Sequence, residues 1–231
     1  MALASLVLAM IAFVGTHFLL SHPLRLKLIG AVGEIRFTLL YSLVAIATLL
    51  WVVFAWLALD DELPIWIAPS WWWWVADAIM LFASVLLIGS FVRNPAFPHP
   101  GAAQKKRAAT GVFAITRHPM NWSFALWAIV HLTLWGSLRN IIVAGGILIL
   151  AIGGSIGQDM KKRRAMGASW LDWEAKTSFV PFGALFTGRA RWRSAAPGWI
   201  AGLGGFLFWL VFTFWHVPAY SVIVWIWMSY M

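Results

Sequence analysis

Long apolar stretches follow one another along the chain, and short connections that carry most of the charge separate them. A helix needs ~20 apolar residues to cross the hydrocarbon core of a bilayer. A further apolar stretch at 218–231 would rise only ~20 Å as a helix, so we expect a half-span or a re-entrant segment there. The pattern therefore predicts six membrane-spanning helices before it, at residues 1–20, 37–59, 71–91, 119–138, 141–157 and 198–215.

The composition also indicates a membrane protein. Of the 231 residues, 62% are hydrophobic and only 11% are charged, whereas about a quarter of the residues in a soluble domain are charged. Together with a mean hydropathy of +0.82, this excludes a soluble globular domain, a disordered tail and a fibrous repeat. The chain has no cysteine, which excludes disulfides and Cys-ligated zinc or iron–sulfur sites. No internal repeat is visible, so we predict one all-α domain over residues 1–231, a polytopic membrane helical bundle.

Positive charge is concentrated in three of the connections. The formal net charge is +9, and every Lys and Arg except Arg139 lies at 21–36, 92–118 or 158–197. Because Lys and Arg near span ends mark the cytoplasmic side, we predict an N-terminus outside and a multi-pass protein of a bacterial inner membrane. The same clusters favour contact with anionic lipid headgroups. Basic clusters that flank spans are ordinary in membrane proteins, so nucleic-acid binding is not predicted.

Two histidines lie inside predicted spans, His17 in the first and His131 in the fourth. A polar side chain within a bilayer is costly and suggests a function, although a single histidine there is about as often a packing residue as a ligand. Two neutral imidazoles on facing helices are a common way for a bundle to hold a b-type haem. The residues alone leave both interpretations open. Asp77, in the third span, lies near the predicted outer surface and is left outside the site.

A basic segment, Arg117-His118-Pro119, precedes the apolar part of the fourth span. Proline suits the first turn of a helix. Arg117 and His118 then lie at the cytoplasmic interface, either as a snorkelling arginine with a capping histidine or as a clamp for a carboxylate, propionate or phosphate. The long connection at 158–188 combines a charged helix with an aromatic face, which fits a membrane-surface helix or a lid over a cytoplasmic site.

Several blocks, in their order and spacing, resemble the NnrU family, and plant and algal zeta-carotene isomerases are similar to this family too. The blocks are residues 17–21, Arg25, 116–119, Trp127, His131, Asp159, Gly167, Trp170 and 177–182. The resemblance to the bacterial members implies a role in denitrification, in the expression or assembly of nitrite and nitric oxide reduction. The resemblance to the isomerases implies a b-type haem on two membrane histidines, whose places here are His17 and His131.

A more distant likeness is to isoprenylcysteine and phospholipid methyltransferases. In those enzymes an Arg-His-Pro block near a span start binds S-adenosylmethionine, which implies a cofactor carboxylate on Arg117 and His118 here. Residues 120–122 are Met-Asn-Trp where such enzymes usually have Tyr and Gly, and a lone Asp159 stands where they carry paired glutamates. Methyl transfer is therefore ranked second.

The leading hypothesis is one b-type haem between the first and fourth predicted spans, with His17 and His131 as axial ligands. The further cofactor-binding side chains are predicted to be Arg25, Arg117, His118, Asp159, Thr177 and Ser178. A six-coordinate haem suits electron transfer or redox sensing, and the expected partner is a respiratory nitrite or nitric oxide reductase system. The alternatives are an S-adenosylmethionine-dependent membrane methyltransferase, a carotene-isomerase-like enzyme and a cofactor-free assembly factor. No catalytic residue is assigned.

Overall fold

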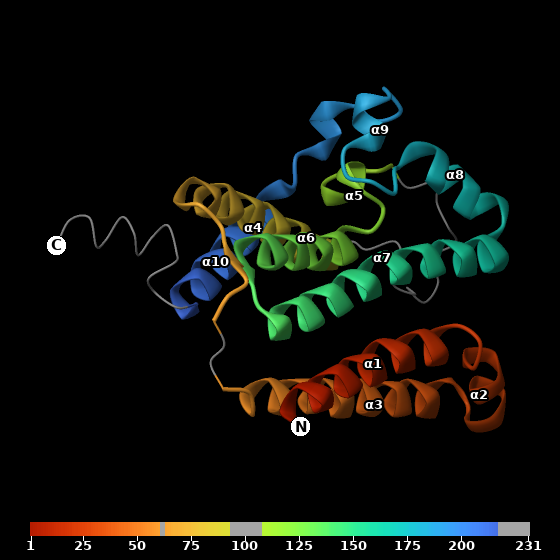
Figure 1. Ribbon diagram of the computed structural model, residues 1–231. Coiled ribbons are helices and arrows are strands. Elements are labelled where there is room, and N and C mark those ends of the chain that lie inside the picture. The colour runs from red at the N-terminus through yellow and green to blue at the C-terminus, as the bar shows by residue number, and fades with distance from the viewer. Residues whose placement is uncertain (61–62, 93–107, 217–231) are drawn as a thin grey trace. The chain divides into compact units, whose positions relative to one another are not determined.

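The computed structural model describes residues 1–60, 63–92 and 108–216, and within them the chain is mostly helical (Figure 1). The predicted short segment at 218–231 lies outside the described residues. The helices are α1 Ala2–Ser21, α2 Arg25–Val32, α3 Glu34–Leu57, α4 Ser70–Phe91, α5 Val112–Ile115, α6 Pro119–Leu134, α7 Leu138–Met166, α8 Ala168–Lys176, α9 Gly183–Phe186, the 3₁₀ helix η1 Trp192–Ala195 and α10 Gly198–Trp215. The fold is an all-α membrane bundle, as the hydrophobic pattern predicted.

Five of the described helices are long and apolar enough to cross a bilayer, namely α1, α3, α4, α7 and α10. The predicted span at 119–138 corresponds to α6, which has only 16 residues and ends at Leu134. At ~1.5 Å per residue such a helix rises ~24 Å, less than the ~30 Å hydrocarbon core. The predicted span at 141–157 is the middle of α7, which begins earlier and continues to Met166.

Two local features explain why the fourth and fifth predicted spans differ from α6 and α7 in length. After α6 the chain is extended in β2, Trp135–Gly136, which pairs antiparallel with β1, Trp66–Ile67. Gly136 makes this pairing possible, because a Cβ there would overlap the indole of Trp66. The polar end of α7 stays helical because its Lys and Arg side chains are good helix formers and suit a helix C-terminus.

The chain divides into two compact units, which are described separately. The first comprises Met1–Ala68 with His131–Gln158, and the second comprises Pro69–Val130 with Asp159–Met231. The division therefore falls within α6, after Val130, and within α7, after Gln158.

In the first unit, α1 and α3 pack along their length on a core of Leu6, Ala9, Met10, Phe13, Val52 and Ala55. Glycines on α7 provide room for side chains of α1 and of His22, the residue that follows it. A Cβ on Gly146, Gly153 or Gly157 would overlap, in that order, Met10, Phe18 or His22. Both series rise together, so α1 and α7 run parallel, and the absent Cβ atoms let them approach closely as small residues do in membrane bundles.

In the second unit, α4 packs antiparallel on α10 through small residues. A Cβ on Gly205 would lie 2.6 Å from the Cα of Val85, and one on Gly89 would lie 3.1 Å from the Cβ of Ala201. A second core joins α5 and α8 to α4, formed by Leu86, Val112, Phe113, Ile115, Trp170 and Trp173.

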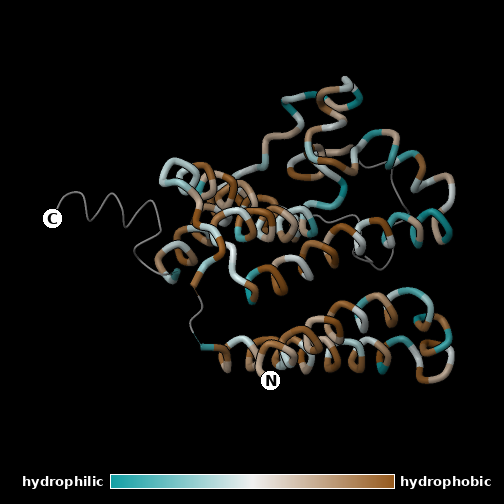
Figure 2. The backbone as a smooth tube through the Cα atoms, viewed as in Figure 1, coloured by the Kyte–Doolittle hydropathy of each residue, from teal (hydrophilic) through white to brown (hydrophobic). Residues whose placement is uncertain are grey.

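The outer faces of the long helices are apolar. Ile11, Leu43 and Phe54 are 64%, 64% and 65% exposed, and Figure 2 shows α1 and α3 predominantly in the colours of hydrophobic residues, with hydrophilic residues towards the end of α7. Surfaces of this kind are uncommon on soluble monomers. They fit helices whose neighbours are lipid chains.

Candidate functional site

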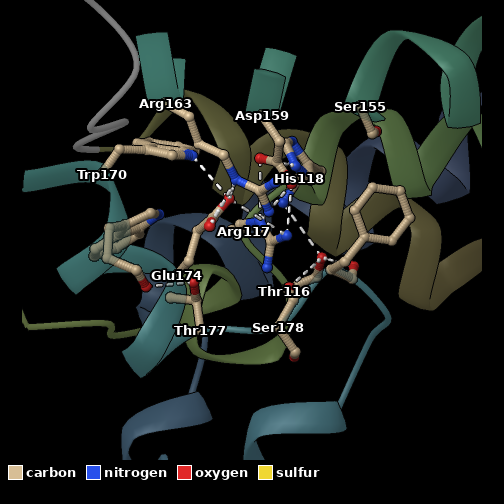
Figure 3. Close-up of polar contacts among 12 residues, drawn as sticks. Thr116, Arg117, His118, Ser155, Asp159, Arg163, Trp170, Glu174, Thr177 and Ser178 are labelled. Atoms are coloured by element: carbon tan, nitrogen blue, oxygen red, sulfur yellow. Dashed lines mark hydrogen bonds and ion pairs between the residues drawn. The ribbon is translucent and has the colours of Figure 1, made fainter. Parts of the chain in front are cut away.

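A polar cluster, buried except for the side chain of Arg163, lies in the second unit, where the start of α6 meets the charged end of α7 and the helix α8 (Figure 3). We call it the Arg117 cluster, and its members are Arg117, His118, Asp159, Arg163 and Glu174. Local structure places the first two members between two helices: α5 ends at Ile115, Thr116 after it is extended, and Pro119 begins α6. Arg117 and His118 thus occupy the short turn between two helices.

Asp159 is the centre of the cluster. Arg117 donates from Nε to both carboxylate oxygens of Asp159, at 3.1 and 2.9 Å, and from Nη2 to Oδ2 at 2.5 Å. The Nε2 of His118 lies 2.8 Å from Oδ1 of the same carboxylate. The side chains of Arg117 and Asp159 are only 10% and 7% exposed. Bidentate arginine–carboxylate pairs are among the strongest hydrogen-bonded contacts in proteins.

Glu174 joins α8 to the same cluster. Its carboxylate accepts hydrogen bonds from Nε of Arg163 at 3.0 and 2.9 Å and from Nε1 of Trp170 at 3.0 Å. It also lies 3.8 Å from Nη2 of Arg117, as Figure 3 shows. Two arginines are thus balanced by two carboxylates. The side chain of Arg163 is 53% exposed, whereas Arg117 and both carboxylates are nearly buried, and a buried charge is stable only when it is paired.

Backbone contacts hold the Thr116–His118 turn against the segment that follows α8. The Oγ1 of Thr116 donates to the carbonyl of Phe179 at 2.7 Å, and the N–H of Arg117 donates to the carbonyl of Ser178 at 2.9 Å. Trp122, one turn into α6, donates from Nε1 to the Phe179 carbonyl at 2.8 Å. The two blocks singled out in the sequence, 116–119 and 177–182, therefore form one hydrogen-bonded structure.

The hydroxyl groups of Thr177 and Ser178 are used within the fold. Thr177 donates to the carbonyl of Trp173 at 2.7 Å, and Ser178 donates to the carbonyl of Ile115 at 3.4 Å. Both residues are buried. Their predicted role in cofactor binding stays a prediction.

The anion clamp predicted for Arg117 and His118 has an internal partner in the structure. Asp159, a carboxylate of the chain itself, takes the Nε and Nη2 donors of Arg117. The Nη1 donors of Arg117 make no hydrogen bond to the part of the chain that the structure describes. A propionate or cofactor carboxylate on these residues stays a prediction.

His17 lies in the first unit, on α1. Its Nδ1 is 2.7 Å from the carbonyl of Phe13, and because a carbonyl only accepts, Nδ1 carries the hydrogen. In the neutral ring the lone pair is then on Nε2. The ring lies against Phe13, at 4.4 Å between centroids, and edge-on to Tyr41 of α3, at 5.6 Å.

His131 and Arg25 also belong to the first unit. The carbonyl of His131, in the last turn of α6, accepts a hydrogen bond from Nδ2 of Asn140 at 2.7 Å. Arg25 pairs with Glu34 at 3.5 Å and lies over the ring of Phe37. Within the described residues no group of three or more His, Cys, Asp or Glu side chains is arranged to hold a metal ion. A haem with two axial histidines needs only two such side chains.

Glu174 and Arg163 are members of the cluster that reasoning from the sequence did not select. The signal for Glu174 was the spacing from Trp170, because residues four apart lie on the same face of a helix. Without the fold, that acid could not be distinguished from Asp172, which pairs with Lys176 at the surface.

Two comparisons with known proteins agree with the resemblance seen in the sequence. The family model described as NnrU protein matches residues 5–224. The chain is 31% identical over 83 residues to 15-cis-zeta-carotene isomerase, chloroplastic, of Arabidopsis thaliana; the match covers 35% of this chain and only 22% of that protein. No solved structure matches the chain.

Proposed function

Starting from the fact that this chain belongs to the NnrU family, we propose that it is a membrane protein that binds one b-type haem through His17 and His131 and serves in redox chemistry or sensing. The observation that carries the proposal is the hydrogen bond from Nδ1 of His17 to the carbonyl of Phe13.

A histidine that ligates a metal donates its second ring N–H to a carbonyl, carboxylate or water, which sets the tautomer and the ring orientation. His17 has this arrangement, with Nδ1–H on Phe13 and the lone pair on Nε2. Nε2 makes no hydrogen bond within the described residues. The rings of Phe13 and Tyr41 contact the imidazole and restrict its rotation. A metal-binding histidine needs such a fixed ring orientation.

His131 supplies the second imidazole in this proposal. It lies in the same compact unit as His17 and on a different helix, and the chain has no cysteine to compete as a ligand. A haem held by two histidines exchanges one electron at a time and has no open position for a substrate. Arg25, partly exposed in the same unit, carries the positive charge that would pair with a propionate.

The biological setting that we propose is bacterial denitrification, at the inner membrane, with a nitrite or nitric oxide reductase system as the partner. The resemblance of the blocks around Arg25, Thr116 to Pro119 and His131 to the NnrU family supports this setting. A bacterial strain that lacks this protein should accumulate nitrite or nitric oxide under denitrifying growth. Normal nitrite and nitric oxide reduction in that strain would refute the setting but would leave the haem proposal intact.

The optical spectrum of the purified protein, oxidised and reduced with dithionite, tests the haem directly. We expect a low-spin b-type spectrum with about one haem per chain in a pyridine haemochrome assay, and loss of that spectrum in His17→Ala and in His131→Ala. His22→Ala is the matched control, because His22 lies near His17 but binds Ser21 through Nδ1. Its spectrum should be that of the wild type.

Two results would overturn the haem proposal. One is a colourless protein after expression with ample haem. The other is an unchanged spectrum in both His17→Ala and His131→Ala.

The identity to 15-cis-zeta-carotene isomerase favours a second candidate, isomerisation of a cis double bond in a polyene. The match covers 22% of that enzyme, so the activity is a separate proposal. Incubation of the haem-loaded protein with 15-cis-zeta-carotene, followed by chromatography of the isomers, tests it. Unchanged substrate under reducing and oxidising conditions would remove it.

A further inference from the structure

Aromatic rings form a continuous stack from the wall of α4 to the surface of the second unit. The ring of Phe182 stacks on Phe82 of α4, with centroids 5.4 Å apart and planes at 19°. Phe182 also stacks on Trp192, at 6.4 Å and 22°. Phe186 lies edge-on to Trp192 at 5.2 Å. We call Phe182, Phe186 and Trp192 the aromatic platform.

The backbone at Phe182 is shaped for this stack. Its φ is +65°, the left-handed region that a residue with a Cβ adopts only at a cost. Its N–H nevertheless donates to the carbonyl of Ile115 at 2.8 Å. A backbone hydrogen bond therefore joins the segment that carries the platform to the end of α5.

The outer part of the platform is exposed, and Trp192 has an arginine on each side in the sequence. Phe186 is 77% exposed and Trp192 is 56% exposed. Arg191 and Arg193, which flank Trp192, are exposed and form no ion pair within the described part of the chain. Arg189 differs from them, because its Nη1 donates to carbonyls at the end of α8, including that of Thr177 at 2.9 Å.

The platform also lies close in sequence to a membrane span. Trp192 precedes Gly198, the first residue of α10, by only six positions, and α10 is apolar and long enough to cross a bilayer. Trp and Arg are the side chains that occupy the boundary between hydrocarbon and headgroups, the ring at the level of the glycerol and the guanidinium at the phosphate.

We propose that the exposed faces of Phe186 and Trp192, with Arg191 and Arg193, bind an anionic phospholipid: the two guanidinium groups bind the phosphate and headgroup, and the rings contact the first part of the acyl chains. A soluble polyanion would use the arginines and leave two large exposed rings without a partner, whereas a phospholipid uses both. The site is independent of the haem proposal, since its residues belong to the second unit and His17 and His131 belong to the first.

Native mass spectrometry of the purified protein with short-chain lipids tests the site. Dioctanoyl phosphatidylglycerol should bind more tightly than dioctanoyl phosphatidylcholine. Arg191→Gln with Arg193→Gln should weaken phosphatidylglycerol binding by about tenfold or more, since each basic residue contributes to the attraction of an anionic lipid. Trp192→Leu should weaken binding of both lipids, because the ring contacts the acyl chains that they share.

The matched control is Lys27→Gln with Arg36→Gln. These two residues are exposed and lie in the first unit. Their replacement removes as much positive charge as the Arg191/Arg193 variant does. The control should change phosphatidylglycerol affinity less than twofold.

Three results would overturn the proposal. The first is wild-type affinity in the Arg191/Arg193 variant. The second is an equal loss in the control variant, which would indicate general attraction by the net charge. The third is equal binding of glycerol phosphate, which has no acyl chains and would indicate a simple phosphate site.

Discussion

Arg117 and His118 are consecutive in the sequence, and the carboxylate of one residue, Asp159, binds both of their side chains, at 2.5 Å from Nη2 of Arg117 and 2.8 Å from Nε2 of His118. The pair at the start of α6 is thus matched by a single acid on α7. This contact explains why Asp159, the first charged residue after the apolar part of α7, is buried. The positive charges of its partners, and not solvent, stabilise its carboxylate.

Replacement of that acid should be costly. Asp159→Asn removes the charge that neutralises a nearly buried guanidinium, and loss of one member of a buried ion pair costs about 3–5 kcal/mol. We expect a loss of this order in the free energy of unfolding, measured by denaturation in detergent micelles. Asp172→Asn is the control, because Asp172 and Lys176 are 48% and 40% exposed; its effect should stay below about 1 kcal/mol. Equal stability of Asp159→Asn and the wild type would refute the role of the pair.

Two substitutions of Glu174 separate the contribution of its charge to stability from that of its hydrogen bond. Glu174→Gln keeps an acceptor for Nε1 of Trp170 but loses the charge beside the nearly buried guanidinium of Arg117, so we expect a loss of about 1–3 kcal/mol. Glu174→Ala should cost about 1 kcal/mol more, because the buried Trp170 N–H then has no acceptor. Thermal unfolding of the two variants side by side measures the difference, and equal midpoints would mean that the Trp170 hydrogen bond contributes nothing.

The contact between α4 and α10 predicts opposite effects at two glycines of one helix. Gly205→Ala places a Cβ 2.6 Å from the Cα of Val85, so the helices must separate, and we expect a loss of about 1–3 kcal/mol. Gly202→Ala meets nothing within 4 Å and should be neutral or stabilising by up to about 1 kcal/mol, because alanine has the higher helix propensity. If both variants unfold like the wild type, the packing of α4 on α10 is wrong.

Tyr41 should influence any haem bound by His17. Tyr41→Phe keeps the edge-on ring contact with the imidazole, whereas Tyr41→Leu removes it. We expect the low-spin electron paramagnetic resonance signal of the oxidised haem to be unchanged in Tyr41→Phe and shifted or broadened in Tyr41→Leu, because the imidazole plane loses a restraint. The haem content of both variants should equal that of the wild type, so a shift reports ring orientation and not loss of the cofactor. The same signal in Tyr41→Leu as in the wild type would contradict the restraint.

Much of the helical architecture follows from local properties of the chain. The length of an apolar stretch between charged connections determines whether a helix can cross a bilayer, and the spans at α1, α3, α4 and α10 were predicted within a few residues for that reason. Pro119 and Gly167 similarly mark where α6 begins and where α7 gives way to α8. Family membership was also visible in the order and spacing of short blocks, which the match over residues 5–224 confirms.

Other features depended on contacts between residues far apart in the sequence. The pairing of Trp66 with Gly136 ends α6 early, although its apolar run continues to Leu138. The hydropathy pattern could not predict this end, because it carries no information on strand pairing. Arg117 pairs with Asp159, 42 positions away, whereas the sequence suggested either a snorkelling arginine or a clamp for an external anion. Glu174 was indistinguishable from other surface acids until α8 folded onto Arg163 and Trp170. Local pattern determines which segments become helices in lipid, but a charge inside the protein is stable only beside its partner, and the partner is chosen by the packing of the whole chain.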